Sequence, residues 1–172
     1  GLLRELGFDV TLLSARVARE GGGFGPEFDH LALLVRLEAR WLADVGFGAA
    51  GPLLPVAFEP GVARAQFLWQ YRLAEQGGLW SLQSGAHDWA ELYQFTLQEQ
   101  ALADYEMASY YVSTHPDSRF VQGLIAHRLA HRLGNVVAVA GQAGWLHHDR
   151  RHESRAAVDR GRELLQLPGF GA

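Results

Sequence analysis

Short runs of strand-forming residues, each bounded by glycine, proline or polar residues, occupy the N-terminal half of the chain. β-Branched and aromatic residues within the runs, and turn-forming residues between them, are typical of β-strands. Two runs, 30–37 and 41–45, are joined by a short turn and predict a hairpin. Many short strands at close spacing indicate a barrel or a sandwich. The predicted strands are 8–17, 30–37, 41–45, 53–58, 66–74, 79–83 and 89–97.

Helical patterns flank this region at both ends. Leu2, Leu3 and Leu6 lie on one helical face, and Gly7 suits the left-handed residue after a helix end. The chain therefore opens in the last turns of a helix, which we expect to belong to a preceding helical domain. Residues 98–110 contain neither glycine nor proline and predict a second helix, which the His-Pro pair further on should end.

The remaining residues predict two strands, 119–127 and 135–140, and a helix over 153–167. The predicted fold class is mixed α and β, a β-barrel that runs into a small α/β lobe. We expect three parts, which are the end of a helix over 1–8, the β-barrel over 9–97, and an interdomain helix with the α/β lobe over 98–172.

Composition and charge limit the classes of partner that the chain is expected to bind. The 172 residues are 48% hydrophobic and 20% charged, enough for one sizeable core. The net charge of -4 and the pI near 6.0 provide no basic field for nucleic acid, which favours a small molecule or a protein as partner. No apolar run approaches the ~20 residues of a membrane span, so a soluble cytoplasmic protein is expected. The absence of cysteine excludes disulfides and thiolate metal sites.

A histidine and an aspartate lie near the same end of the predicted hairpin, because His30 opens its first strand and Asp44 lies near the end of its second. A histidine becomes a general base when a carboxylate fixes its tautomer and stabilises the imidazolium formed when it takes a proton. Spacing alone favours a simpler interpretation. A histidine in an apolar strand is more often a satisfied core residue, and an aspartate before a glycine is more often a turn residue.

Four blocks of sequence change this balance, and together they resemble the arylamine N-acetyltransferases in order and rough spacing. The resemblance covers most of residues 1–127, and its Asp-Val-Gly-Phe-Gly and Ser-Thr-His-Pro-Asp-Ser-Arg-Phe motifs are fairly specific together. The first block runs from Leu6-Gly7-Phe8 through Ala15-Arg16-Val17. The other three are His30-Leu31-Ala32-Leu33-Leu34-Val35, Asp44-Val45-Gly46-Phe47-Gly48 and Tyr111-Val112-Ser113-Thr114-His115-Pro116-Asp117-Ser118-Arg119-Phe120.

The resemblance implies a cysteine-protease-like acetyltransferase fold. In that family a helical N-terminal domain carries an Arg-Gly-Gly-x-Cys motif, a barrel supplies histidine and aspartate, and an α/β lid follows. Acetyl passes from acetyl-coenzyme A to the cysteine, and from the thioester to an arylamine, arylhydroxylamine or hydrazine, without a metal. His30 would activate the thiol and Asp44 would orient His30. The chain would then be the barrel and lid portion, inactive alone because it contains no cysteine.

Ligand contacts follow from the same resemblance. Gly46 and Gly48 would let substrate or the pantetheine arm approach the backbone, and Phe47 would offer its ring to an aromatic amine. The alternative for Phe47 is a core aromatic. The coenzyme A contacts would come from Tyr111 and from the adjacent loop residues Thr114, Asp117 and Ser118. A loop that ends a helix needs no ligand to explain it, and an aspartate is not an obvious phosphate ligand.

Two other interpretations remain open. In the first, the chain is a non-catalytic module that keeps a coenzyme A or aromatic pocket without the thiol. In the second, it is an unrelated β-rich structural domain. A metal site is not expected. His148 and His152 are four residues apart and suit one helix face, but with His147 they have no third ligand partner at suitable spacing, and we interpret all three as surface residues.

Overall fold

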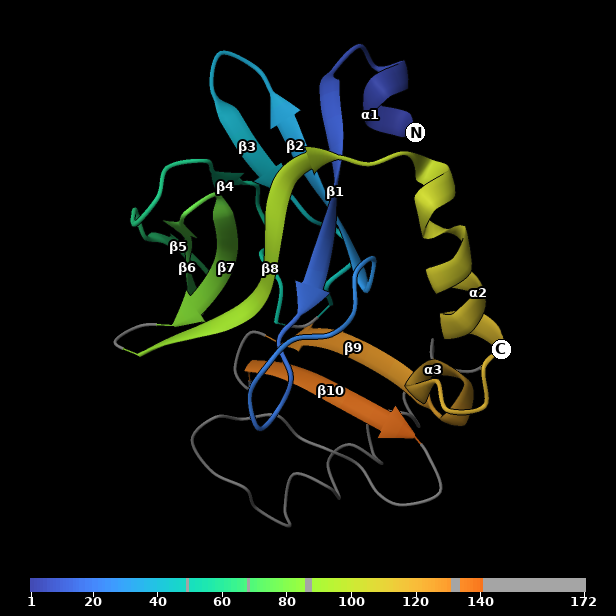
Figure 1. The fold of residues 1–172 in the computed structure, drawn as a ribbon. Coiled ribbons are helices and arrows are strands. Elements are labelled where there is room, and N and C mark those ends of the chain that lie inside the picture. Colours follow the sequence, from blue (N-terminus) through green and yellow to red (C-terminus); the bar gives the residue numbers. More distant parts are fainter. Residues whose placement is uncertain (49, 68, 86–87, 131–133, 141–172) are drawn as a thin grey trace. The chain divides into compact units, whose positions relative to one another are not determined.

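The computed structural model describes residues 1–48, 50–67, 69–85, 88–130 and 134–140. The chain forms two compact units, Gly1–Ala108 and Ser109–Ala172, and each is considered by itself. The first unit is built on one eight-stranded antiparallel sheet (Figure 1). The second contains a two-stranded sheet and short helices.

The large sheet has the strand order β4-β3-β2-β1-β8-β7-β6-β5. Pro60, which follows β4, forms a bridge with Leu73 of β6, so the sheet curls into a nearly closed barrel. The predicted barrel is therefore confirmed, together with the β2–β3 hairpin. The strands are β1 (Asp9–Val17), β2 (His30–Arg36), β3 (Arg40–Ala43), β4 (Val56–Ala57), β5 (Arg64–Gln66), β6 (Trp69–Gln76), β7 (Leu79–Gly85) and β8 (Trp89–Glu99).

The inward positions of these strands form one hydrophobic core. Alternate residues of a strand face one side of a sheet, and in a curled sheet that side is the interior. Each buried leucine or valine stabilises the fold by about 1.5–3 kcal/mol relative to an exposed one. The largest fully buried side chains are Tyr71, Tyr93, Leu13, Leu34, Leu42, Leu73, Leu82 and Val56.

Strand β8 bends sharply as it crosses the barrel (Figure 1). Its pairing with β1 shifts register between Leu13 and Ala15, and its pairing with β7 shifts between Leu82 and Gln83. Such irregularities increase the local twist and bend a strand. The inward residues Tyr93 and Phe95 of this strand reach the centre of the core.

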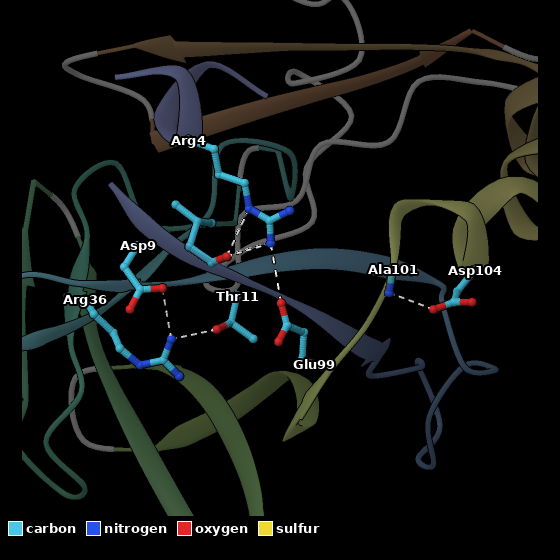
Figure 2. Close-up of polar contacts among 8 residues, drawn as sticks. Arg4, Asp9, Thr11, Arg36, Glu99, Ala101 and Asp104 are labelled. Atoms are coloured by element: carbon cyan, nitrogen blue, oxygen red, sulfur yellow. Dashed lines mark hydrogen bonds and ion pairs between the residues drawn. The ribbon is translucent and has the colours of Figure 1, made fainter. Parts of the chain in front are cut away.

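Polar contacts attach the N-terminal helix α1 (Leu2–Glu5) to one end of the barrel (Figure 2). The Arg4 guanidinium donates through Nε and Nη2 to the Val10 carbonyl at 3.1 and 2.7 Å, and Nη2 lies 3.5 Å from Glu99. On the neighbouring strand, Arg36 donates to Asp9 and Thr11. The helix end predicted over 1–8 is thus present and connects β1 with β8.

The second unit begins within helix α2 (Glu106–Thr114), which follows the 3-10 turn η1 (Leu102–Tyr105). The short helix α3 (Arg119–Gln122) leads into a hairpin of β9 (Leu124–Ala130) and β10 (Gly134–Ala140). Strand β10 confirms the prediction over 135–140. The helix predicted over 153–167 and the histidines at 147, 148 and 152 lie outside the described residues.

Two predicted strands are wrong in extent, for local backbone reasons. Only β4 forms within 53–58, because Pro52 and Pro55 cannot donate to a strand ladder. Residues 66–74 form no single strand, since β5 ends and β6 begins within that range. Between the two strands Phe67 has a left-handed φ of 56°, which interrupts extended backbone.

Two predictions beyond the barrel are also partly wrong. The helix predicted over 98–110 begins later, because β8 extends to Glu99, and α2 then ends at Thr114, just before the His-Pro pair as predicted. Residues 119–127 begin as helix α3 rather than strand. The Ser118 hydroxyl caps that helix by accepting a hydrogen bond from the Phe120 N–H at 3.3 Å.

Candidate active site

The hairpin brings His30 and Asp44 into direct contact. His30 is the first residue of β2, and Asp44 follows the last residue of β3, which pairs with Leu33. The distance between His30 Nε2 and Asp44 Oδ2 is 2.7 Å. The two side chains are 11% and 0% exposed. The pair that the sequence singled out is therefore a buried, hydrogen-bonded His–Asp couple at the end of the hairpin.

The second carboxylate oxygen of Asp44 holds the loop after β3. Asp44 Oδ1 accepts hydrogen bonds from the backbone N–H groups of Gly46 at 3.0 Å and Phe47 at 3.1 Å. Burial raises the pKa of Asp44, but the hydrogen bond and charge of His30, the Gly46 N–H and the Tyr93 hydroxyl together lower it below its usual value of 3.8. The carboxylate is therefore ionised at neutral pH.

This ionisation determines the proton positions on the His30 ring. An ionised carboxylate only accepts hydrogen bonds, so Nε2 carries the proton that Asp44 receives. In the neutral ring Nδ1 then has a free lone pair, and no described residue donates to it. His30 can accept a proton at Nδ1 while Asp44 stabilises the positive charge that results.

Two aromatic rings border the couple. The Phe47 ring lies edge-on to His30 with centroids 5.3 Å apart, and Tyr93 of β8 lies 5.2 Å from His30 and 5.3 Å from Phe47. Phe47 is partly buried against the core. The Phe47 ring therefore belongs to the edge of the core, as the alternative interpretation expects, and it also faces the histidine.

Tyr93 is the site residue that the sequence did not indicate. Its side chain is fully buried. Burial, followed by the charge of Asp44, raises the pKa of Tyr93 well above 10, so the phenol stays neutral. The hydroxyl faces Asp44 closely enough to perturb the pKa of both groups, but it forms no hydrogen bond of normal geometry with any described residue. A tyrosine within an apolar strand gives no sequence signal of such a role.

The two glycines of the loop differ in what they require. Gly48 has a φ of 91°, a left-handed conformation that side-chain-bearing residues rarely adopt. Gly46 has no such requirement, and a methyl group added there would meet His30 Cε1 at an ordinary contact distance of 3.6 Å. Both glycines are exposed next to the couple. Gly48 is therefore needed by the turn, whereas Gly46 leaves open space beside the histidine.

The four residues expected to contact coenzyme A belong to the second unit, near the end of α2. The Tyr111 ring is half-exposed and stacks on His115 with centroids 4.4 Å apart. The Thr114 hydroxyl donates to the Tyr110 carbonyl at 2.6 Å. The Asp117 carboxylate is exposed.

Ser118 differs from these neighbours because it is buried. Its hydroxyl donates to the Val112 carbonyl at 2.6 Å while it caps α3. Contacts with the local backbone account for the hydroxyl groups of Ser118 and Thr114. The side chains of Tyr111 and Asp117 are accessible to solvent.

Comparison with known proteins identifies the family to which this chain belongs. A family model described as N-acetyltransferase matches residues 1–161. An arylamine N-acetyltransferase of Escherichia coli strain K12 is 36% identical over 129 residues, which cover 74% of this chain and 46% of that protein. One of Mycolicibacterium smegmatis is 38% identical over 129 residues, covering 72% and 47%. The chain belongs to the arylamine N-acetyltransferase family, and spans about half the length of these curated relatives.

Solved structures agree with this assignment. The Mycobacterium marinum arylamine N-acetyltransferase in complex with CoA superposes with a TM-score of 0.71 at 29% identity, covering 99% of this chain and 68% of that one. A Bacillus cereus enzyme, described as having a unique Cys-His-Glu catalytic triad, superposes with a TM-score of 0.68 at 25% identity, covering 80% and 55%. These likenesses confirm the predicted fold class.

The described part of the chain contains no cluster of three or more histidine, aspartate or glutamate side chains placed to hold a metal ion. Among its helices none is long and apolar enough to span a membrane.

Proposed function

We propose that this chain is the base-bearing portion of an arylamine N-acetyltransferase, in which His30 and Asp44 serve a cysteine located outside these 172 residues. The observation that carries the proposal is the 2.7 Å contact between His30 Nε2 and Asp44 Oδ2, inside a fold shared with that family. A related Bacillus cereus enzyme is described as using cysteine, histidine and a carboxylate together. The same division of roles suits the couple seen here.

The proton positions indicate how the reaction would proceed. A thiol approaching Nδ1 of His30 would give up its proton there, and the imidazolium would stabilise the thiolate. The thiolate would attack the acetyl carbonyl of acetyl-coenzyme A, and the coenzyme A sulfur would leave with the proton held at Nδ1 of His30, which returns the ring to its neutral form. The amine nitrogen would then attack the thioester, and His30 would carry the proton from the amine back to the departing sulfur.

The substrates follow from the relatives and from the rings beside the couple. We propose an arylamine, arylhydroxylamine or hydrazine as acceptor, with Phe47 facing its aromatic ring and Gly46 and Gly48 leaving room beside the backbone. Coenzyme A would be contacted by Tyr111 and Asp117, with Thr114 and Ser118 shaping that loop. No metal takes part. A cytoplasmic enzyme of xenobiotic metabolism is consistent with such substrates.

The test is a fusion that restores the missing nucleophile. The N-terminal segment of a bacterial arylamine N-acetyltransferase, with its Arg-Gly-Gly-x-Cys motif, is placed before Gly1, and acetylation of an arylamine is measured with acetyl-coenzyme A. The 172-residue chain alone should show no transfer, because no sulfur is present to form the thioester. The fusion should be active, and its His30→Gln variant inactive. Activity that survives His30→Gln would refute the assignment, as would transfer by the chain alone.

The complete lack of cysteine favours one second candidate, a non-catalytic module that binds coenzyme A or an aromatic ligand. The coding sequence directly before Gly1 discriminates the two. An in-frame Arg-Gly-Gly-x-Cys motif there supports the enzyme. An immediate start codon, combined with binding of coenzyme A by the isolated chain, supports the module.

A further inference from the structure

A buried tyrosine of β6 bonds to the loop that follows the candidate site. Tyr71 lies on β6 and its side chain is 1% exposed. Its hydroxyl donates to the backbone carbonyls of Ala50 at 3.1 Å and Gly51 at 2.8 Å. Both carbonyls belong to segment 50–54, which connects the Phe47 turn to β4. The core therefore holds this segment by its backbone, in addition to the packing of Ala50.

A second buried polar residue fixes the other end of segment 50–54. Gln66, the last residue of β5, is 6% exposed. Its Nε2 donates to the Leu54 carbonyl at 2.9 Å, and its Oε1 accepts from the Leu54 N–H at 2.8 Å. The amide thus reproduces the pair of bonds that a neighbouring strand would form. The two leucines at the end of the segment are themselves exposed, so side-chain packing does not hold them.

The polar atoms of these two residues are not needed to fill the core. Phenylalanine at position 71 and methionine at position 66 would occupy nearly the same volume without a buried hydroxyl or amide. Burying a polar group is costly unless it is hydrogen-bonded, so the retained polar atoms indicate a role in their contacts. Burial also raises the pKa of Tyr71 to about 12, which keeps the hydroxyl a donor across the neutral range.

Segment 50–54 in turn packs closely against Phe47. A methyl group added at Gly51 would lie 2.9 Å from Phe47 Cβ, closer than side chains tolerate. The Gly51 N–H also donates to the carbonyl of Gly48, the residue that follows Phe47, at 2.9 Å. The Phe47 ring lies edge-on to His30. A continuous series of contacts therefore runs from the Tyr71 hydroxyl through Gly51 to the ring beside the base.

We propose that Tyr71 and Gln66 are positioning residues, which hold segment 50–54 against Phe47 and thereby fix the aromatic wall of the acceptor site. The assignment of that wall to the acceptor rests on the proposed function. The positioning itself concerns only this chain. Neither residue touches the His30–Asp44 couple, so they set the place of the ring rather than the chemistry of the base.

The experiment uses the 172-residue chain, with Tyr71→Phe and Gln66→Met as variants and Tyr105→Phe as the matched control. Tyr105 also has a buried hydroxyl, but it bonds to no described residue and does not contact segment 50–54. Two NMR quantities are measured, which are the exchange rates of the Gly51 and Leu54 amide protons and the ring-proton shifts of His30. The His30 shifts report the ring currents of Phe47 and of the core residue Tyr93, and a change in overall stability alone would not move them.

We expect the Gly51 amide to exchange about 10-fold faster in Tyr71→Phe, and the Leu54 amide to do so in Gln66→Met. Both variants should move the His30 ring shifts, and Tyr105→Phe should change neither quantity. Equal His30 shifts in Tyr71→Phe, Gln66→Met and the control would overturn the proposal, even if the variants were less stable. An inactive wild-type fusion together with moved His30 shifts would refute the proposed function and leave the positioning intact.

Discussion

Asp44 uses its two carboxylate oxygens for different purposes. Oδ2 receives the His30 proton, and Oδ1 receives the two loop amides. An asparagine has only one oxygen, so it can satisfy the loop or the histidine but not both. If its oxygen stays with the Gly46 and Phe47 amides, its NH2 group faces the Nε2–H of His30 and two donors oppose each other. The single change therefore acts on the tautomer of the base as well as on its charge.

Asp44→Asn should consequently abolish most activity of the cysteine-bearing fusion while the fold persists. In a serine-protease triad the corresponding change lowers turnover about 10⁴-fold, and loss of the carboxylate here should also shift the pH dependence of thiol alkylation upward. The measurements are the rate of cysteine acetylation, the alkylation profile and the melting temperature. Asp29→Asn is the control, because Asp29 is exposed one residue before His30. Unchanged acetylation and alkylation in Asp44→Asn would make Asp44 a turn residue.

The lowered pKa of Asp44 also makes a prediction for stability in acid. Its native pKa lies below the unfolded value of 3.8, so its contribution is complete above that value and is lost as pH falls through the native pKa. Each unit of lowering corresponds to about 1.4 kcal/mol. Urea unfolding between about pH 6 and pH 3 should show this loss in the wild type.

Two variants separate this contribution from other carboxylates. Asp44→Asn should have a flatter pH dependence of the free energy of unfolding. Tyr93→Phe removes a hydroxyl that lowers the native pKa of Asp44, so its acid loss should be smaller than in the wild type and complete at a higher pH. At neutral pH the variant should lose only the stability that this lowering contributes, because the buried hydroxyl forms no hydrogen bond of normal geometry with any described residue. Identical acid limbs in all three proteins would contradict the assigned causes.

At the scale of elements, the sequence predicted what local pattern determines. The β2–β3 hairpin follows from two short strand-forming runs and a turn, and it alone brings His30 and Asp44 together. Tyr93 could not be placed, because its position depends on β8 pairing with β1, as in the Val17–Tyr93 pair of residues distant in sequence. The bonds from Tyr71 to the β3–β4 connection depend on barrel closure in the same way.

The β3–β4 connection offers a test through its two glycines. Gly48→Ala forces a side chain into the left-handed region and should lower the free energy of unfolding by roughly 1–2 kcal/mol. Gly46→Ala fits without such strain, so its stability should change by less than about 1 kcal/mol. In the fusion, Gly46→Ala should nevertheless reduce acetylation, because its methyl group lies beside His30. Equal losses of stability in urea unfolding would show that the turn does not depend on Gly48.

At the scale of the whole molecule, the first unit has a complete core but leaves apolar side chains in solvent. Leu2 of α1 and Leu6, which caps that helix, are 68% and 64% exposed, on the helical face that the sequence predicts they share. Arg4 and Glu99 attach this helix to the barrel, yet α1 contains no buried residue. Contiguous exposed apolar surface on a soluble protein marks a place where another surface binds.

The isolated chain should therefore bind a hydrophobic dye and self-associate as its concentration rises, through the Leu2–Leu6 face of α1. Leu2→Gln combined with Leu6→Gln should reduce dye fluorescence and shift sedimentation toward the monomer, because glutamine preserves helix propensity while removing apolar area. Leu79→Gln is the matched control, since Leu79 is also exposed but lies beside the β6–β7 turn, away from α1 in sequence. A monodisperse wild-type monomer with little dye binding would contradict the prediction, and so would equal effects of the α1 and Leu79 variants.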